Sequence, residues 1–108
     1  MSVTEMNWVP VLACDTLPAG EMIGLEIGDH RVAVYNVDGT FHATDNVCTH
    51  AYALLTDGWL DDAVVECPLH GGQFNVCTGE AICTPAEVNL RTFSVRVVDG
   101  QVEVLLPV

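Results

Sequence analysis

Two short clusters of metal-binding residues stand out in this sequence. Cys48 and His50 are separated by one residue, Cys67 and His70 by two, and sixteen residues lie between the two clusters. Each cluster offers one thiolate and one imidazole. Two cysteines and two histidines can bind a tetrahedral zinc ion, or a [2Fe–2S] cluster in which two histidines replace two cysteines. The first alternative predicts a structural module and the second predicts an electron carrier.

The distribution of the four residues favours the iron–sulfur alternative. Zinc fingers usually take both cysteines from one knuckle and both histidines from the other, whereas each cluster here supplies one of each. If each loop places one residue on each iron, one iron receives two thiolates and the other receives two imidazoles. On the residues alone, a zinc-bound structural module stays open as the alternative.

The residues around the four ligands resemble those of a known family. The segments 48–50 and 67–71, which read CTH and CPLHG, are similar to the signature of the Rieske family. The segments 49–58 and 71–81 resemble the ferredoxin components of bacterial aromatic ring-hydroxylating dioxygenase systems, and the segment 76–83 is most similar to those of the naphthalene type. The resemblance implies one Rieske-type [2Fe–2S] cluster, with Cys48 and Cys67 on one iron and His50 and His70 on the other.

The same resemblance implies a function. Rieske ferredoxins of this kind are soluble one-electron carriers, and they turn over no organic substrate themselves. They accept electrons from a flavin-containing, NADH-oxidising reductase and deliver them to a terminal oxygenase. The alternatives are a Rieske subunit of another oxygenase or reductase, such as a diiron monooxygenase, and the zinc-bound module.

The resemblance also predicts a low reduction potential, near or below the bottom of the Rieske range of roughly −150 to +300 mV. Related high-potential proteins carry an extra cysteine in each loop, where this chain has Ala53 and Leu69. They also carry hydroxyl donors where this chain has Gly72 and Phe74. Hydrogen bonds to the sulfurs raise the potential, so their loss lowers it.

The chain is strongly acidic, with fifteen Asp and Glu residues, three Arg, no Lys and a net charge of −12. This balance argues against nucleic acid and against anionic membrane surfaces, because both require basic patches. It suits a carrier that is steered toward basic faces of partner proteins. We expect the docking face to surround His50 and His70, assisted by Asp45, Asp57 and Glu80.

The N-terminal residues lack the pattern of a signal peptide, and no apolar run is long enough to span a membrane. We therefore expect a cytoplasmic protein, in which the other cysteines (Cys14, Cys77 and Cys83) are reduced and buried. The two histidines outside the motif, His30 and His42, are expected to be ordinary surface or core residues.

Alternating apolar residues and Asp-Gly turns predict an all-β protein. The expected strands are 8–13, 21–27, 31–37, 40–43, 92–98 and 101–106, with Phe93, Val95 and Val97 on one core face and Val102, Val104 and Leu106 on another. Together with the resemblance, this predicts a single Rieske domain over 1–108. An antiparallel β-sandwich base (1–45 and 85–108) would carry a small cluster-binding subdomain (46–84).

Overall fold

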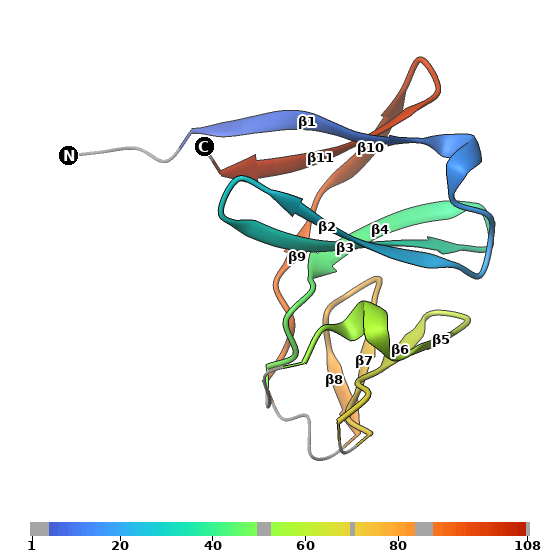
Figure 1. The fold of residues 1–108 in the computed structure, drawn as a ribbon, viewed down its shortest axis with the longest axis vertical. Coiled ribbons are helices and arrows are strands. Elements are labelled where there is room, and N and C mark those ends of the chain that lie inside the picture. The colour runs from blue at the N-terminus through green and yellow to red at the C-terminus, as the bar shows by residue number, and fades with distance from the viewer. Residues whose placement is uncertain (1–4, 50–52, 70, 84–87, 108) are drawn as a thin grey trace.

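The computed structural model describes residues 5–49, 53–69, 71–83 and 88–107, without the side chain of Cys83. Within these ranges the chain forms antiparallel strands and two single-turn 3-10 helices, as predicted for an all-β protein (Figure 1). The first sheet contains β1 (Met6–Ala13), β11 (Gln101–Pro107) and β10 (Val95–Val98). The second contains β2 (Met22–Ile27), β3 (His30–Val37), β4 (Thr40–Asp45) and β9 (Thr92–Phe93). The third contains β5 (Trp59–Asp61), β6 (Val64–Glu66), β7 (Gln73–Asn75) and β8 (Ala81–Cys83).

The first and second sheets pack face to face and enclose one apolar core. On β11, Val102, Val104 and Leu106 are buried, which confirms the alternation predicted for this strand. They share a core cluster with Val32 and Val34 of β3. These two sheets are the sandwich that the sequence predicted.

The Asp-Gly dipeptides at 38–39 and 99–100 form the turns that the sequence predicted. Asp38 and Gly39 join β3 to β4 with φ angles of 54° and 93°, and Asp99 and Gly100 join β10 to β11 with 51° and 77°. Positive φ at both central residues is the geometry of a type I′ hairpin turn, which matches the twist of the paired strands. The register of both hairpins follows from these turns.

The prediction of one continuous strand over 92–98 is wrong. The chain changes sheets at Ser94, so that Phe93 pairs with β4 in the second sheet and Val95 pairs with β11 in the first. Phe93 is buried, but the side chain of Val97 is 52% exposed, so the predicted core face ends early. The backbone N–H of Leu105 donates to the Ser94 carbonyl across the break. The alternation of apolar residues therefore continues through Ser94, where the chain passes from the second sheet to the first.

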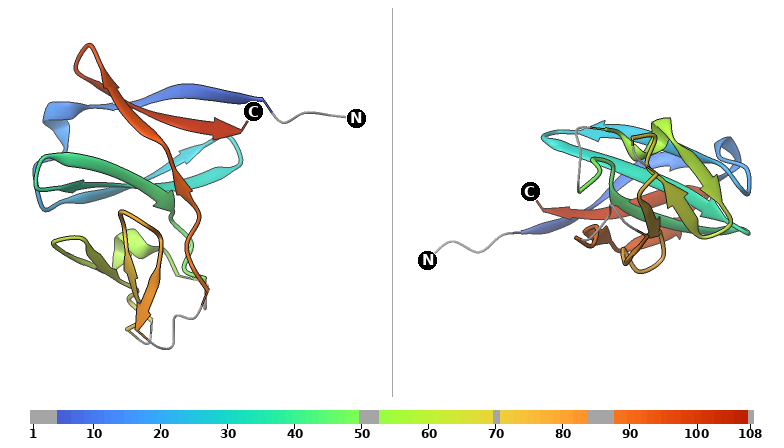
Figure 2. Two further views of the ribbon diagram at one scale, coloured as in Figure 1. Left: turned by 180° about the vertical axis from the view of Figure 1, so that it is seen from behind. Right: turned by 90° about the horizontal axis from the view of Figure 1, so that it is seen from below.

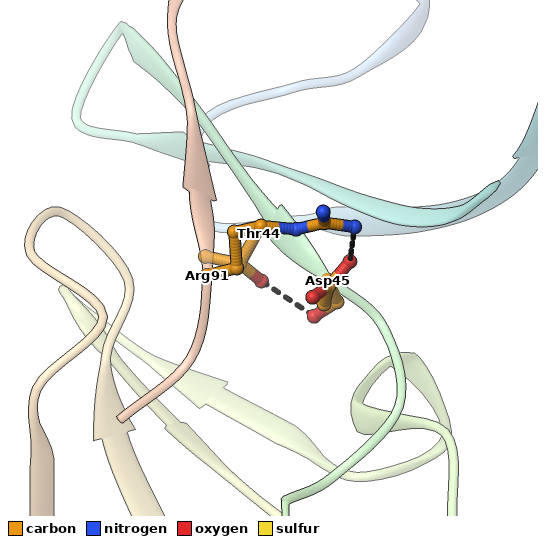
Figure 3. Close-up of polar contacts among 3 residues, drawn as sticks. All are labelled: Thr44, Asp45 and Arg91. Atoms are coloured by element: carbon orange, nitrogen blue, oxygen red, sulfur yellow. Dashed lines mark hydrogen bonds and ion pairs between the residues drawn. The ribbon is translucent and has the colours of Figure 1, made fainter. Parts of the chain in front are cut away.

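The third sheet is inserted between β4 and β9 and lies below the sandwich (Figure 1). The chain leaves the second sheet at Asp45 and returns at Arg91, and these two residues are joined twice (Figure 3). The Asp45 amide donates to the Arg91 carbonyl at 2.9 Å, and Arg91 Nη2 lies 3.1 Å from Asp45 Oδ1. The Arg91 guanidinium also covers the ring of Phe93. The two crossing points are therefore held side by side.

The cysteines outside the two clusters differ from the prediction that they are buried. Cys14 is half-buried and Cys77 is exposed, so the prediction is wrong for Cys77. The side chain of Cys83 lies outside the described part of the structure. Among the described residues, no helix is long and apolar enough to cross a membrane.

Gly79 offers a test of how the third sheet is joined to the returning chain. It has a φ of 79°, its carbonyl accepts the amide of Leu90, and a Cβ at this position would overlap the Leu90 carbonyl oxygen. We expect Gly79→Ala to lower the free energy of unfolding by roughly 3 kcal/mol or more, because strain and overlap add. Gly100 has a similar φ of 77° and open space around it, so Gly100→Ala should cost only about 1–2 kcal/mol. Equal losses in urea unfolding of the two variants would contradict this account.

Candidate metal centre

Two loops with the same backbone closure carry the predicted cysteines. The amide of Cys48 donates to the carbonyl of Ala53 at 2.9 Å, and the amide of Cys67 donates to the carbonyl of Gly72 at 2.8 Å. In both loops the cysteine therefore binds the residue five positions later. The first loop follows β4, and the second joins β6 to β7. Because the same backbone hydrogen bond closes both loops, two separate segments hold their cysteines in the same way.

The structure describes two of the four predicted ligands. Cys48 and Cys67 come together, whereas His50 and His70 lie outside the described residues. In the sequence, His50 lies between the residues that close the first loop, and His70 lies between those that close the second. Their role as ligands stays a prediction.

The two cysteine side chains meet in a buried apolar core. The exposed fraction of Cys48 is 4% and that of Cys67 is 0%, and their thiols are joined by a hydrogen bond. Both belong to one core cluster with Leu55, Val65 and Phe74, each of which is fully buried. Neither cysteine forms a disulfide, so the two side chains offer a pair of thiols for a metal.

The surroundings of Cys67 set the state of its thiol. Burial, with a smaller contribution from the neighbouring Cys48 thiol, raises the pKa of Cys67 to about 11. The backbone N–H of Leu69 donates to the sulfur and acts in the opposite direction. A buried thiol of this kind is protonated at neutral pH until a metal replaces the proton. Two adjacent cysteine thiols in a buried apolar core are suited to bind the thiolate-ligated iron of a [2Fe–2S] cluster.

Asn46 is a supporting residue that the sequence analysis missed. It is 3% exposed, its Oδ1 accepts the amide of Thr56 at 3.0 Å, and its Nδ2 donates to the Thr56 hydroxyl at 2.9 Å. Its carbonyl also accepts the amide of Leu55. The side chain therefore fixes the two ends of the first loop. A single buried asparagine leaves no periodic pattern, and its only sign in the sequence is its place two residues before Cys48.

Further hydrogen bonds brace each loop from outside. The Thr49 hydroxyl donates to the carbonyl of Val88 at 2.7 Å, which ties the first loop to the returning chain. Gln73 Nε2 donates to Glu66 Oε1 at 2.9 Å across the two strands that flank the second loop. Each loop is thus supported by a neighbouring segment as well as by its own closure.

The three acidic residues expected to assist docking have different surroundings. The carboxylate of Asp45 is engaged by Arg91, as described above, so its charge is compensated within the chain. Asp57, in the 3-10 helix Leu55–Asp57, and Glu80, in the turn between β7 and β8, are exposed. Asp57 and Glu80 therefore offer uncompensated charge to a partner.

The chain matches known proteins over most of its length. The model of the Rieske [2Fe-2S] domain family matches residues 7–94. The ferredoxin component of the naphthalene 1,2-dioxygenase/salicylate 5-hydroxylase systems of Ralstonia sp. is 42% identical over 91 residues. That alignment covers 84% of this chain and 88% of the relative.

Two solved structures have the same fold. A chain in the complex of reduced oxygenase and oxidized ferredoxin in carbazole 1,9a-dioxygenase gives a TM-score of 0.86 at 43% identity, over 90% of this chain and 91% of that one. The ferredoxin of Sphingomonas yanoikuyae B1 gives a TM-score of 0.89 at 38% identity, over 94% of this chain and all of that one. With two buried cysteines on matching loops, these likenesses show that the chain belongs to the Rieske [2Fe–2S] family, as one of its small electron-transfer ferredoxins of the dioxygenase-system type.

Proposed function

We propose that this chain carries single electrons from a flavin-containing, NADH-oxidising reductase to a terminal oxygenase that hydroxylates aromatic rings. The observation that carries the proposal is the pair of buried cysteines, Cys48 and Cys67, on two loops with the same closure. The relatives support the partner: one is named as a component of naphthalene and salicylate systems, and one structure contains a ferredoxin together with an oxygenase. The relatives thus support the oxygenase as a partner more directly than the reductase. We place this exchange in the cytoplasm.

Within the site, Cys48 and Cys67 hold one iron, and His50 and His70 hold the other. When bound, the cluster takes up and releases one electron at a time. Residues 46–84 form the cluster-binding subdomain, and 1–45 with 85–108 form its base. The separate third sheet and the paired crossing points at Asp45 and Arg91 support this division. The zinc-bound module is disfavoured by the family to which the chain belongs.

The chain's own residues tune the site toward low potential. The amide of Leu69 donates to the sulfur of Cys67 and by itself raises the potential, because it stabilises negative charge there, but side-chain hydroxyl donors are missing. Phe74 is fully buried in the same core cluster and offers no hydroxyl donor. The apolar core around the two thiols therefore keeps water away from them, and the ring of Phe74 adds no hydroxyl donor.

The two loops expose apolar side chains, whereas the acidic Asp57 and Glu80 lie on the 3-10 helix that contacts β2 and in the turn between β7 and β8. Leu69 is 43% exposed and Val88 is 63% exposed, and the bond from Thr49 places Val88 beside the first loop. We propose that these two side chains make the central contact with the oxygenase. Asp57 and Glu80 then speed the encounter with a basic face at low ionic strength.

Substitution of one cysteine tests the cluster. We expect Cys67→Ser to lose both irons per chain and the rhombic electron paramagnetic resonance signal of the dithionite-reduced protein, because a hydroxyl is a poor ligand for the cluster. Cys14→Ser, at a half-buried cysteine outside both loops, should keep iron and signal. One zinc and no iron per chain in the unsubstituted protein would overturn the electron-carrier proposal.

Replacement of Phe74 tests the account of the potential. Phe74→Tyr should raise the midpoint potential by roughly 40–90 mV, since a hydrogen bond worth about 1–2 kcal/mol more in the reduced state favours reduction. Phe93→Tyr adds the same hydroxyl in the other core cluster and should leave the midpoint unchanged. An unchanged or lowered midpoint for Phe74→Tyr would count against the hydrogen-bond account.

Neutralising the free acidic residues tests the steering. The double variant Asp57→Asn with Glu80→Gln should slow electron transfer to the oxygenase several-fold at low salt, and the difference should vanish at high salt. Asp99→Asn removes one charge at the β10–β11 turn, on the far side of the sandwich from the third sheet, and should have little effect (Figure 1). Rates that respond to neither mutation nor salt would rule out a steering role.

A further inference from the structure

The two tryptophans of this chain have different surroundings. Trp8 lies on β1, and Arg96 Cζ lies over its ring at 4.3 Å from the centroid. Arg96 Nε in turn lies 2.7 Å from Glu103 Oε1, so an indole, a guanidinium and a carboxylate lie together on the first sheet. Trp59 of β5 is 62% exposed, and among the described residues no cation covers its ring. Only the first tryptophan has an arginine within the chain.

Trp59 has acidic neighbours on its own face of the third sheet. It pairs with Glu66 of β6, and residues that lie opposite each other in antiparallel strands have their side chains on the same face. Asp61 follows Trp59 by two residues along β5 and lies on this face as well. The other face of the sheet carries Val65 and Phe74, which are fully buried. Trp59 therefore points away from the core, next to carboxylates that can bind a guanidinium.

The chain supplies no cation to this face. The segment 46–84 contains five acidic residues and neither Lys nor Arg. The three arginines lie outside this segment, and each is beside a carboxylate elsewhere in the described structure (Glu26, Asp45 or Glu103). The third sheet thus carries an indole and carboxylates as the first sheet does, but the guanidinium between them is missing.

Trp59 lies beside the second cysteine loop. Gly58 packs so closely against this segment that a Cβ there would overlap the Glu66 carbonyl oxygen and lie 3.1 Å from Pro68 Cδ. β5 is an edge strand, and its hairpin with β6 projects from one side of the molecule, where it is yellow-green in Figure 2. Leu69, in the proposed contact with the oxygenase, belongs to the same loop as Pro68. An interface of about 800 Å² per partner is wide enough to include both Leu69 and Trp59.

We propose that Trp59 is the docking site for an arginine of the terminal oxygenase. The guanidinium stacks on the exposed indole and bonds the neighbouring carboxylates, as Arg96 does with Trp8 and Glu103 within the chain. Continuity with Leu69 identifies the partner as the oxygenase, and the charge of the third sheet identifies the docked side chain as a cation. This inference rests on the proposed transfer of electrons to an oxygenase. Trp and Arg are the residues that most often dominate the affinity of an interface.

The test measures binding of the cluster-loaded protein to a purified aromatic-ring-hydroxylating oxygenase that the unsubstituted protein reduces. Trp59→Ala and Trp59→Leu should each weaken binding at least about tenfold, because neither side chain has an aromatic face. Trp59→Phe keeps a ring and should weaken binding by no more than roughly threefold. The matched control is Trp8→Leu, which should bind as tightly as the unsubstituted protein because Arg96 already occupies that indole.

Three further readouts separate docking from damage to the cluster and from steering. Iron content, the paramagnetic signal and the midpoint potential should be the same in all variants. The loss at Trp59 should persist at high salt, because a contact that excludes water is screened little, whereas the effect of Asp57 and Glu80 should vanish. Electron transfer from the reductase to Trp59→Leu should be as fast as to the unsubstituted protein.

The outcomes distinguish the docking site from the function on which it rests. Normal electron transfer and equally tight binding by Trp59→Leu would overturn the docking site alone. Equal losses in Trp59→Phe and Trp59→Leu would exclude a stacked cation, and a defect confined to the reductase step would overturn the oxygenase as the occupant. Failure of the unsubstituted, cluster-loaded protein to reduce any such oxygenase would overturn both the proposed function and the docking site.

Discussion

The rest of the structure depends on one arrangement: two thiols lie next to each other in a buried apolar core. Cys48 and Cys67 come from different loops, and a buried loop must satisfy its own backbone polar groups. Each loop does so by closing the amide of its cysteine onto a carbonyl five residues later. Among the described residues, the Asn46 side chain adds bonds to both the backbone and the hydroxyl of Thr56. These local hydrogen bonds let the two thiols be buried in an apolar core.

The sandwich is the frame that supports the core around the two cysteines. Its two sheets have their own core, whereas the cysteines belong to a second core that extends from β3 into the third sheet. Ala33 and Tyr35 of β3 face this second core, and Val32 and Val34 face the first. One strand therefore contributes alternate residues to both cores, which couples the loops to the frame by packing. The paired crossing of Asp45 and Arg91 adds a polar link at the same boundary.

Much of the frame was predictable because its signals are local. The Asp-Gly turns and the alternation of Val102, Val104 and Leu106 depend only on neighbours in the chain, and both predictions were correct. The alternation of Phe93, Val95 and Val97 gave the wrong result, because a change of sheet at Ser94 leaves the pattern of residues intact. The position of Trp59 beside the second loop and the role of Asn46 arise from tertiary contacts, which spacing along the chain does not encode. In the site itself, the motifs predicted that Cys48 and Cys67 come together. They did not predict the hydrogen bonds that support the two loops.

The pairing of the first strand with the last has a consequence for the order of events during synthesis. Met6 of β1 lies opposite Pro107 of β11, so the first sheet requires residues from both ends of the chain. Because β11 follows both cysteine loops in the chain, the ribosome makes these loops before the first sheet can close, and non-local pairing of this kind is slow. The cysteine ligands are therefore made before the sandwich that supports their burial is complete.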